Sequence, residues 1–352
     1  MNAVHVIVPD SIDDSARPSG GNVYDRRLCD GLVANGWSVE EHPLSGTWPR
    51  PDAEAVNALI GVLTGLADGA VVVIDGLIAS AAADVPSFAR RLVLLVLVHM
   101  PLAQGSDDVA ATRAIEGAVL AAAAGVVATS AWTKNWLVEQ YALEPDRIHI
   151  VEPGTDAAEL APGTPGGGEL LCVAAVTRAK GHDVLVTALA EVKDLAWRCI
   201  CAGATDLDPG FVDRLEREAV RGGVADRMRF VGTRVGAELE ATYAAADLVV
   251  LCSRAETYAM VVTEALARGI PVIATEVGGV PEALGYDSNS TRPGILVPPD
   301  DPVAVATALR RWHGDADLRR QLRQAARERR AVLSGWATTA SRFGDVLAGL
   351  AA

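Results

Sequence analysis

Residues 248–274 read LVVLC (248–252), SRAETYA (253–259), MVVTEALAR (260–268) and GIPVIA (269–274). The first run is short, apolar and without polar alternation, which is typical of a strand covered on both faces. Residues 260–268 have helical character, and a second apolar run follows over 271–274. A strand, a helix and a second strand in this order favour a parallel sheet with a right-handed crossover.

The same alternation of short apolar runs and longer amphipathic stretches extends over the whole chain. Helix-like segments include 23–34, 182–192, 236–246 and 260–268. Six strands are expected in each half, so the sequence predicts an α/β protein made of two Rossmann-like, doubly wound parallel-sheet domains that face a cleft. The expected strands are 4–8, 38–41, 70–74, 92–98, 125–128 and 148–151, followed by 170–175, 197–201, 228–231, 248–252, 271–274 and 295–297.

The domain boundary is expected at a proline- and glycine-rich segment. Residues 157–168 end in three consecutive glycines, a composition that cannot sustain a helix or a central strand. We therefore predict an N-terminal domain over 1–156, a linker over 157–168 and a C-terminal domain over 169–352. Residues 336–350 have helical spacing, and the sequence leaves open whether this helix stays on the C-terminal domain or packs back on the N-terminal one.

Composition excludes several classes of function. The 352 residues carry a net charge of −14, which argues against a general nucleic-acid binder but leaves room for a local anion site. The longest apolar run, 92–98, is too short to span a bilayer, and the amino terminus lacks a basic leader. The five cysteines show no zinc-type spacing and are expected to be reduced and buried. We expect a soluble, cytoplasmic protein that needs no metal.

The loop after the strand 248–252 carries the strongest candidate ligand groups. Ligands of open α/β sheets bind beyond the carboxyl ends of the strands, and Glu256 lies there. The helix that follows should offer free N–H groups to a phosphate, and Glu264 lies one turn deeper, where it could accept two ribose hydroxyls. The donor-binding residues predicted here are Thr257, Tyr258, Ala259, Met260, Val261 and Glu264, with Glu256 on the donor sugar.

These two glutamates also admit structural interpretations. Glu264 could pair with Arg268 four residues later, and Glu256 could cap the helix N-terminus. Neither interpretation would involve a ligand.

Two cations follow the first strand of the second half. Arg178 and Lys180 precede Gly181 and a helix, where they could grip a diphosphate from the side opposite the helix at Met260. Solvated surface charges are the alternative, and the position beyond a strand favours the anion site.

A glycine pair also precedes the first helix. Gly20 and Gly21 permit close backbone approach to a ligand and are predicted to bind the donor. The amides near Asn22 could form an anion nest, and Asn22 itself is predicted to lie on the acceptor side. A plain turn would look the same. The spaced glycines of a dinucleotide fingerprint and a Walker lysine are both missing, so a nicotinamide enzyme or an NTPase is not expected.

His99 and Asp75 each follow an apolar strand of the first half. Both should therefore face the cleft from the acceptor side. The histidine could hydrogen-bond a sugar hydroxyl or orient an acceptor, and we include it among the candidate catalytic residues.

Taken together, these residues resemble glycosyltransferase family 4, the retaining sugar transferases with the GT-B fold. The resemblance covers nearly the whole chain and is most specific at the glutamate pair eight residues apart. It further includes Ser19-Gly20-Gly21, His99, the segment VEPGTD (151–156), Arg178 with Lys180, ALARGIPVIA (265–274) and GGVPE (278–282).

The resemblance implies roles by position. Arg178 and Lys180 would hold the diphosphate, Glu256 the donor sugar and Glu264 the ribose, while His99 would line the acceptor side. Two departures stand out: Ala259 replaces the usual glycine after the aromatic residue and narrows the approach to the phosphate, and Pro153 replaces a common asparagine.

The expected function is therefore a retaining, metal-independent hexosyl transfer from a nucleoside-diphosphate sugar. UDP is the working expectation for the nucleotide, and the short first domain favours a small, soluble acceptor. A double-displacement hydrolase would not need the phosphate-binding groups. A sugar-nucleotide epimerase or a phosphorylase on the same fold and a non-catalytic nucleotide-sugar sensor remain alternatives.

Overall fold

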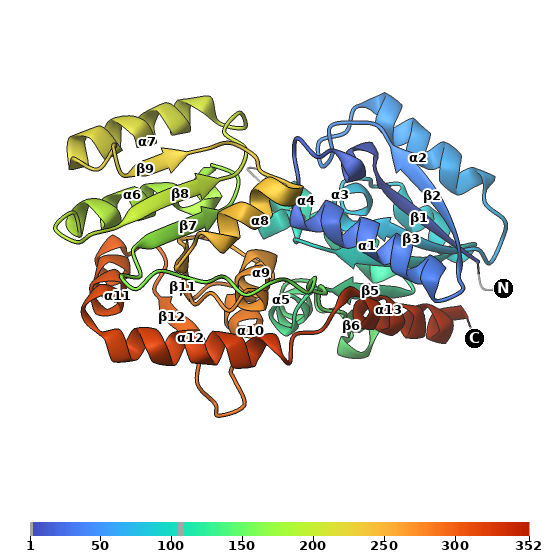
Figure 1. The fold of residues 1–352 in the computed structure, drawn as a ribbon. Coiled ribbons are helices and arrows are strands. Elements are labelled where there is room, and N and C mark those ends of the chain that lie inside the picture. The colour runs from blue at the N-terminus through green and yellow to red at the C-terminus, as the bar shows by residue number, and fades with distance from the viewer. Residues whose placement is uncertain (1–2, 105–108, 352) are drawn as a thin grey trace. The chain divides into compact units, whose positions relative to one another are not determined.

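The computed structural model describes residues 3–104 and 109–351. The chain divides into two compact units (Figure 1). Unit 1 comprises residues 1–14, 18–154 and 334–352, and unit 2 comprises residues 15–17 and 155–333. Each unit is built on its own parallel sheet, as the alternating sequence pattern predicts.

Within its described residues, unit 1 contains a six-stranded sheet with the order β2-β1-β3-β4-β5-β6. All six predicted strands are confirmed. The edge strand β2 runs three residues beyond the predicted end, because its exposed polar residues conceal the strand pattern. The bounds are β1 Ala3–Pro9, β2 Ser38–Leu44, β3 Val71–Asp75, β4 Val93–Val98, β5 Gly125–Ala128 and β6 Ile148–Ile150.

The C-terminal helix α13 (Trp336–Ala351) belongs to unit 1 and packs on α1 (Gly20–Ala34). The two helices meet where Gly31 faces Ala340, and a Cβ atom on Gly31 would lie 2.5 Å from the Cβ atom of Ala340. Phe343 is fully buried beside Leu32 in the core between these helices and the sheet. The remaining elements of unit 1 are α2 Ala53–Gly65, α3 Gly76–Ala79, α4 Val109–Ala122, α5 Ala131–Tyr141 and the 3-10 turns η1 Asp10–Asp13, η2 Val85–Arg90, η3 Leu102–Gln104 and η4 Pro145–Arg147.

Unit 2 repeats the design with the order β12-β11-β10-β7-β8-β9 among its described residues. Its six predicted strands are also confirmed. One of its helices begins at Pro302 with Asp301 as the N-cap. The strands are β7 Glu169–Val173, β8 Arg198–Ala202, β9 Met228–Phe230, β10 Leu248–Leu251, β11 Val272–Thr275 and β12 Gly294–Val297. The helices are α6 His182–Glu191, α7 Pro209–Gly222, α8 Gly236–Ala244, α9 Met260–Ala267, α10 Val280–Leu284, α11 Pro302–Gly314 and α12 Ala316–Arg330, with the 3-10 turn η5 Arg178–Lys180.

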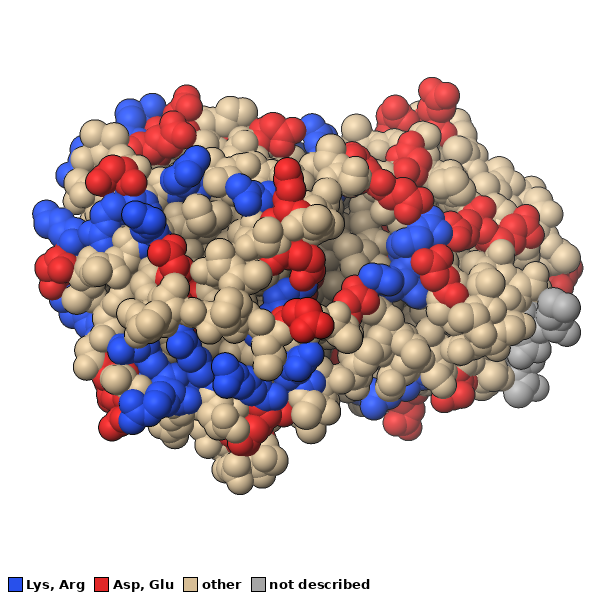
Figure 2. All heavy atoms as spheres, in the orientation of Figure 1, with Lys and Arg blue, Asp and Glu red and all other residues tan. Residues whose placement is uncertain are grey.

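Residues 157–168, for which we predicted a linker, lie within unit 2 and are anchored to it. Thr164 donates from its amide and its hydroxyl group to Asp247, and Arg323 of α12 donates to the same carboxylate. Arg330 donates to the carbonyl group of Ala158. The composition excludes regular structure but says nothing of these side-chain anchors. Figure 2 shows basic side chains gathered over the region that α12 occupies in Figure 1, although the chain as a whole is acidic.

The five cysteines are all buried as free thiols, as predicted. Cys199 and Cys201 lie two residues apart on β8, so their side chains point to the same face of the sheet, where both belong to one core. Within the described part of the chain, no helix has both the length and the apolar character needed to cross a bilayer.

The strand order fixes where each sheet can take a ligand. In unit 2, β7 and β10 are neighbours in the sheet although β8 and β9 lie between them in the sequence, so the chain reverses its winding direction between β7 and β10. In unit 1 the reversal lies between β1 and β3. Open α/β sheets bind ligands beyond the carboxyl ends of the strands at such switch points.

Candidate functional site

The switch point of unit 2 brings two predicted site residues into contact. Lys180 follows β7, Glu256 follows β10, and Lys180 Nζ lies 2.7 Å from Glu256 Oε1. The hydroxyl group of Ser253 donates to the same oxygen over 2.7 Å. The Glu256 side chain is only 10% exposed, whereas that of Lys180 is 31% exposed. A lysine ammonium has three donors, so Lys180 can bond Glu256 and still reach an anion.

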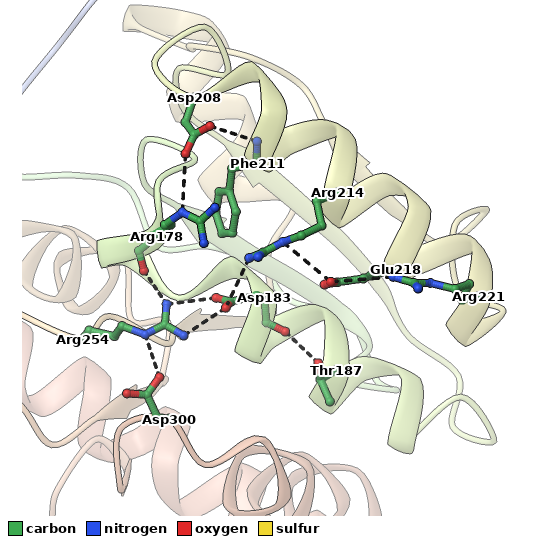
Figure 3. A network of polar contacts seen from close by, with 10 residues as sticks. All are labelled: Arg178, Asp183, Thr187, Asp208, Phe211, Arg214, Glu218, Arg221, Arg254 and Asp300. Atoms are coloured by element: carbon green, nitrogen blue, oxygen red, sulfur yellow. Dashed lines mark hydrogen bonds and ion pairs between the residues drawn. The ribbon is translucent and has the colours of Figure 1, made fainter.

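Arg254 braces the two loops that carry this pair. Its guanidinium group forks onto both carboxylate oxygens of Asp183 at 3.0 Å and bonds Asp300 at 2.6 Å (Figure 3). It also donates to the carbonyl group of Arg178, and its own amide donates to the carbonyl group of Ala179 over 2.8 Å. Bidentate Arg–carboxylate pairs fix geometry, so this network holds Lys180 opposite Glu256.

Arg178 points away from the Lys180–Glu256 pair. Its Nε lies 3.8 Å from Asp208 Oδ2 at the start of α7, and its guanidinium group stands over the ring of Phe211 (Figure 3). The side chain is 66% exposed. The structure therefore brings Lys180 and Glu256 together and leaves Arg178 beside them, on the same turn.

The N-terminus of α9 follows Glu256 in the same loop. Ala259 is the N-cap residue, and its backbone is left-handed with φ 69°. As a result, the amides of Met260 and Val261 lie in the first turn, ahead of any intrahelical acceptor. Ala259 has no side-chain group that could cap the helix, and among the described residues the Glu256 carboxylate accepts hydrogen bonds from Lys180 and Ser253 rather than from the first-turn amides, which does not support the capping interpretation. First-turn amides and the helix dipole suit a phosphate.

Glu264 lies one turn into α9 and is half-buried. Its Oε2 accepts a hydrogen bond from the hydroxyl group of Tyr243 over 2.6 Å. Burial raises the pKa of this carboxyl group, and the bond from Tyr243 opposes that shift. The alternative pairing with Arg268 is wrong, because the Arg268 guanidinium group bonds the carboxylate of Glu240 and reaches only the backbone carbonyl of Glu264.

Tyr258 is a core residue rather than a ligand side chain. Its ring is buried in the apolar core of unit 2 together with Val262 and Leu266, and only 8% of the residue is exposed. Met260 and Val261 are half-buried and pack against the same core. The donor contacts predicted for these three residues stay a prediction, and the first-turn amides of Met260 and Val261 are the groups best suited to a phosphate.

Two glycines back the loop that carries Glu256. Gly278 has φ +53°, and a Cβ atom there would lie 1.5 Å from the carbonyl oxygen of Glu256. A Cβ atom on Gly279 would lie 2.1 Å from the carbonyl oxygen of Thr257, and the Gly279 amide donates to Glu256 over 3.2 Å. Gly181 is similar, since its close approach is to the carbonyl group of Cys252. At these three positions the absence of a side chain therefore allows close packing of one backbone segment against another.

Replacing Ala259 with glycine should make unit 2 more stable by up to about 1 kcal/mol. The left-handed conformation costs a residue with a Cβ atom about 1–2 kcal/mol, and glycine removes this cost. Glycine also gives the unfolded chain more conformational freedom, which offsets about 0.4–1 kcal/mol of the stabilisation. Urea unfolding measures the difference. Ala142→Gly is the matched control, because Ala142 is also left-handed with φ 51° at the end of α5 in unit 1. A less stable Ala259→Gly variant would contradict the strain assigned to this position.

In unit 1, α1 begins at Gly20, three residues before the predicted start. Ser19 is its N-cap, and the Ser19 hydroxyl group accepts from the Asn22 amide over 3.0 Å. Gly20 and Gly21 thus form the first turn rather than a separate nest. The side-chain amide of Asn22 donates to the carbonyl group of Ser11 over 2.8 Å, which ties the preceding loop to the helix. This bond gives Asn22 a structural role, and its predicted acceptor contact stays a prediction.

His99 and Asp75 lie together at the carboxyl edge of the same sheet, and Asp25 of α1 joins them. His99 Nε2 lies 2.7 Å from Asp25 Oδ1, and both aspartates are 2% exposed. Gly21 makes room for the imidazole ring, since a Cβ atom there would lie 3.2 Å from His99 Cδ2. Asp75 Oδ1 accepts from the amide of Leu77, so Asp75 caps the short helix α3.

The electrostatics of this group follow from burial. Burial and the charge of Asp25 raise the pKa of Asp75 to about 8. Burial alone would lower the pKa of His99, but the charge and the hydrogen bond of Asp25 outweigh it and raise that pKa to about 9. Near neutral pH, these pKa values keep Asp75 protonated and the His99 ring charged beside Asp25.

The free energy of unfolding of unit 1 should consequently fall as the pH rises from about 6.5 to 9. The ordinary pKa values are about 3.9 for Asp and about 6.5 for His, so in this window folded unit 1 binds more protons than the unfolded chain. The side chain introduced by Asp75→Asn cannot titrate, so the free energy of unfolding of this variant should depend less on pH in the lower part of this range. The test is the urea midpoint of wild type and Asp75→Asn at a series of pH values, and an equal dependence on pH in both proteins would contradict the raised pKa of Asp75.

Comparison with known proteins places the chain in a family. The family model "Glycosyl transferases group 1" matches residues 167–315, which include the Lys180–Glu256 pair and Glu264. A curated protein of Catenulispora acidiphila, D-inositol 3-phosphate glycosyltransferase 1, is 33% identical over 272 residues, 71% of this chain and 63% of that protein. The chain belongs to glycosyltransferase family 4. The relative of the same name in Salinispora tropica is 32% identical over 270 residues, and the alignment spans only 55% of its length.

Solved structures show that this family member has the GT-B fold. Sucrose-phosphate synthase from Thermosynechococcus elongatus aligns with a TM-score of 0.81 at 22% identity, over 99% of each chain. Anabaena HepE in complex with UDP-glucose aligns with a TM-score of 0.81 at 17% identity, over 99% of this chain and all of that one.

Several residues of the site were missed from sequence. Asp25 did carry a signal: it lies on the stripe of α1 formed by Leu28, Cys29 and Leu32, where a charge is out of place. Tyr243 and Ser253 carried none, because each reaches its glutamate only through the packing of different elements of the fold.

Proposed function

We propose that this family member transfers a hexosyl group from a nucleoside diphosphate sugar to an acceptor hydroxyl group, with retention of configuration and without a metal ion. The observation that carries the proposal is the Lys180–Glu256 pair at the switch point of unit 2, next to the uncapped N-terminus of α9. A cation, a helix N-terminus and a carboxylate in one place match a diphosphate joined to a sugar.

On the donor side, Lys180 and the first amides of α9 would bind the diphosphate, with Arg178 contributing from its exposed position. Glu256 would accept hydroxyl groups of the sugar, and Glu264, oriented by Tyr243, would accept those of the ribose. In the transfer, the bond between the anomeric carbon and the phosphate oxygen breaks, and its electron pair stays on the phosphate. The acceptor oxygen forms the new bond and gives its proton to the leaving phosphate. Lys180 stabilises the charge that develops there.

Unit 1 would serve the acceptor side through the buried group of Asp25, Asp75 and His99. Asp25 orients the imidazole ring and keeps it charged. An imidazolium donates from both ring nitrogens, so His99 can bond Asp25 and still offer an N–H group to a sugar or acceptor hydroxyl group.

The relatives favour a UDP-sugar and a small acceptor. HepE is described in complex with UDP-glucose, and the curated relatives are described as glycosyltransferases of D-inositol 3-phosphate. A soluble polyol or polyol phosphate is therefore the acceptor class we propose.

A panel of sugar nucleotides with and without polyol acceptors tests the function. We expect free nucleoside diphosphate only when donor and acceptor are both present, together with a product of unchanged anomeric configuration. An altered sugar nucleotide without acceptor would indicate an epimerase, and release driven by phosphate would indicate a phosphorylase. Binding without turnover would indicate a sensor. Activity that EDTA abolishes and a divalent ion restores would contradict metal independence.

A further inference from the structure

A second group of ligating side chains lies in unit 1, on strands β1 and β2. His5 comes from β1, and Glu40 and His42 come from β2. The strands pair in parallel with His5 opposite Glu40 and Ile7 opposite His42. Side chains two apart on a strand share a face, so all three ligating side chains point to the same side of the sheet, toward the core that contains Leu59 of α2.

The three side chains converge on one point. His5 Nδ1 lies 3.1 Å from His42 Nε2 and 3.4 Å from Glu40 Oε2, and His42 Nε2 lies 3.9 Å from Glu40 Oε1. Each residue offers one potential ligand atom, and these three atoms all lie within 4.8 Å of one another. In a tetrahedral zinc site with bonds of about 2.0–2.2 Å, neighbouring ligand atoms are about 3.3–3.6 Å apart.

Hydrogen bonding alone leaves this group incompletely satisfied. Each facing ring nitrogen of a neutral imidazole carries at most one proton. If His5 Nδ1 donates to His42 Nε2, it has no proton left for Glu40, and His42 Nε2, whose single lone pair accepts that bond, has no proton to donate to the carboxylate either. A cation between the three atoms would satisfy all of them at once. Both histidine side chains are less than one-fifth exposed, whereas Glu40 is 67% exposed, which gives an ion a route of entry.

We propose that His5, Glu40 and His42 form a binding site for Zn²⁺ that clamps the edge strand β2 to β1. Two imidazoles and one carboxylate are ligands for zinc and its neighbours in the transition series rather than for Mg²⁺. The site is separate from the proposed donor groups, all of which lie in unit 2. Its role is to stabilise an edge strand whose residues are largely exposed, and transfer does not depend on it.

Titrating Zn²⁺ into the chelator-treated full chain, with excess Mg²⁺ present, tests the proposal. We expect one equivalent to bind, Co²⁺ to give a tetrahedral absorption spectrum, and the melting temperature to rise. His42→Gln and His5→Gln should each weaken binding at least 10-fold and abolish the rise. Glu40→Gln should weaken binding to a smaller degree.

Two variants serve as controls. His149→Gln changes a half-buried histidine on β6 of the same unit, and Asp75→Asn changes the other carboxylate–histidine group. Both should keep full Zn²⁺ binding. Equal Zn²⁺ affinity in wild type and His42→Gln would overturn the proposal, as would loss of binding in Asp75→Asn or an octahedral Co²⁺ spectrum. If His42→Gln does not fold in chelator, the Co²⁺ spectrum of the wild-type chain decides.

Discussion

Lys180→Ala should lower the rate of sugar transfer by about 100- to 1,000-fold, the loss seen when one preorganised donor to a developing anion is removed. Lys180 Nζ sits 2.7 Å from Glu256, and the Arg254 network fixes the turn that carries it. Removing the ammonium group also leaves Glu256, only 10% exposed, without its cation. We therefore expect kcat to fall more than KM rises, as measured by nucleoside diphosphate release with the best donor and acceptor.

A control variant shows whether the loss depends on the position of the lysine and not merely on the loss of one positive charge from unit 2. Lys193→Ala removes a lysine from the same unit, outside the loops of the switch point, and should leave transfer unchanged. Arg178→Ala should cost less than Lys180→Ala, because Arg178 is 66% exposed and paired with Asp208. The double variant Lys180→Ala, Glu256→Gln should be less impaired than the product of the single effects, because the two groups act as a unit. Full turnover in Lys180→Ala would place the donor site elsewhere.

The fold could be predicted because its signal is local. Residues 93–98 and 71–74 are continuous apolar runs, a pattern typical of parallel strands covered on both faces. The strand β2 was the least complete prediction, since an edge strand exposes polar residues on both faces. Residues 157–168 are irregular, as their composition indicates, but composition does not show that Asp247 and Arg323 hold the segment in place.

The site was predictable to the extent that topology alone fixes it. Any residue just after β7 or β10 lies at the switch point, so Lys180 and Glu256 could be placed before their contact was known. The direction in which each side chain points could not be predicted from topology. Arg178 and Lys180 lie on one turn yet point to different partners, and Tyr258 turns into the core beside residues whose amides face the loop. These choices depend on tertiary packing.

Gly278→Ala should destabilise unit 2 by about 3 kcal/mol or more and abolish transfer. The methyl group would sit 1.5 Å from the carbonyl oxygen of Glu256, a backbone atom that cannot rotate away. Overpacking of this kind costs about 1–3 kcal/mol, and the left-handed backbone at φ +53° adds about 1–2 kcal/mol. The loop must therefore move, and with it the carboxylate that Lys180 and Ser253 hold in place.

Gly223→Ala isolates the collision from the strain. Gly223 ends α7 with φ +72°, and a Cβ atom there would meet nothing within 4 Å. This variant should lose only the cost of the left-handed conformation and keep its transfer rate, so the difference between the two variants measures the contact with Glu256. Urea unfolding and donor titration on both variants give that difference. Since Gly278 carries no functional group, lost turnover in a Gly278→Ala variant that is still folded would show that the position of the Glu256 loop, and not merely its side chains, is required for transfer. Turnover equal to that of Gly223→Ala would instead separate this loop from the donor site.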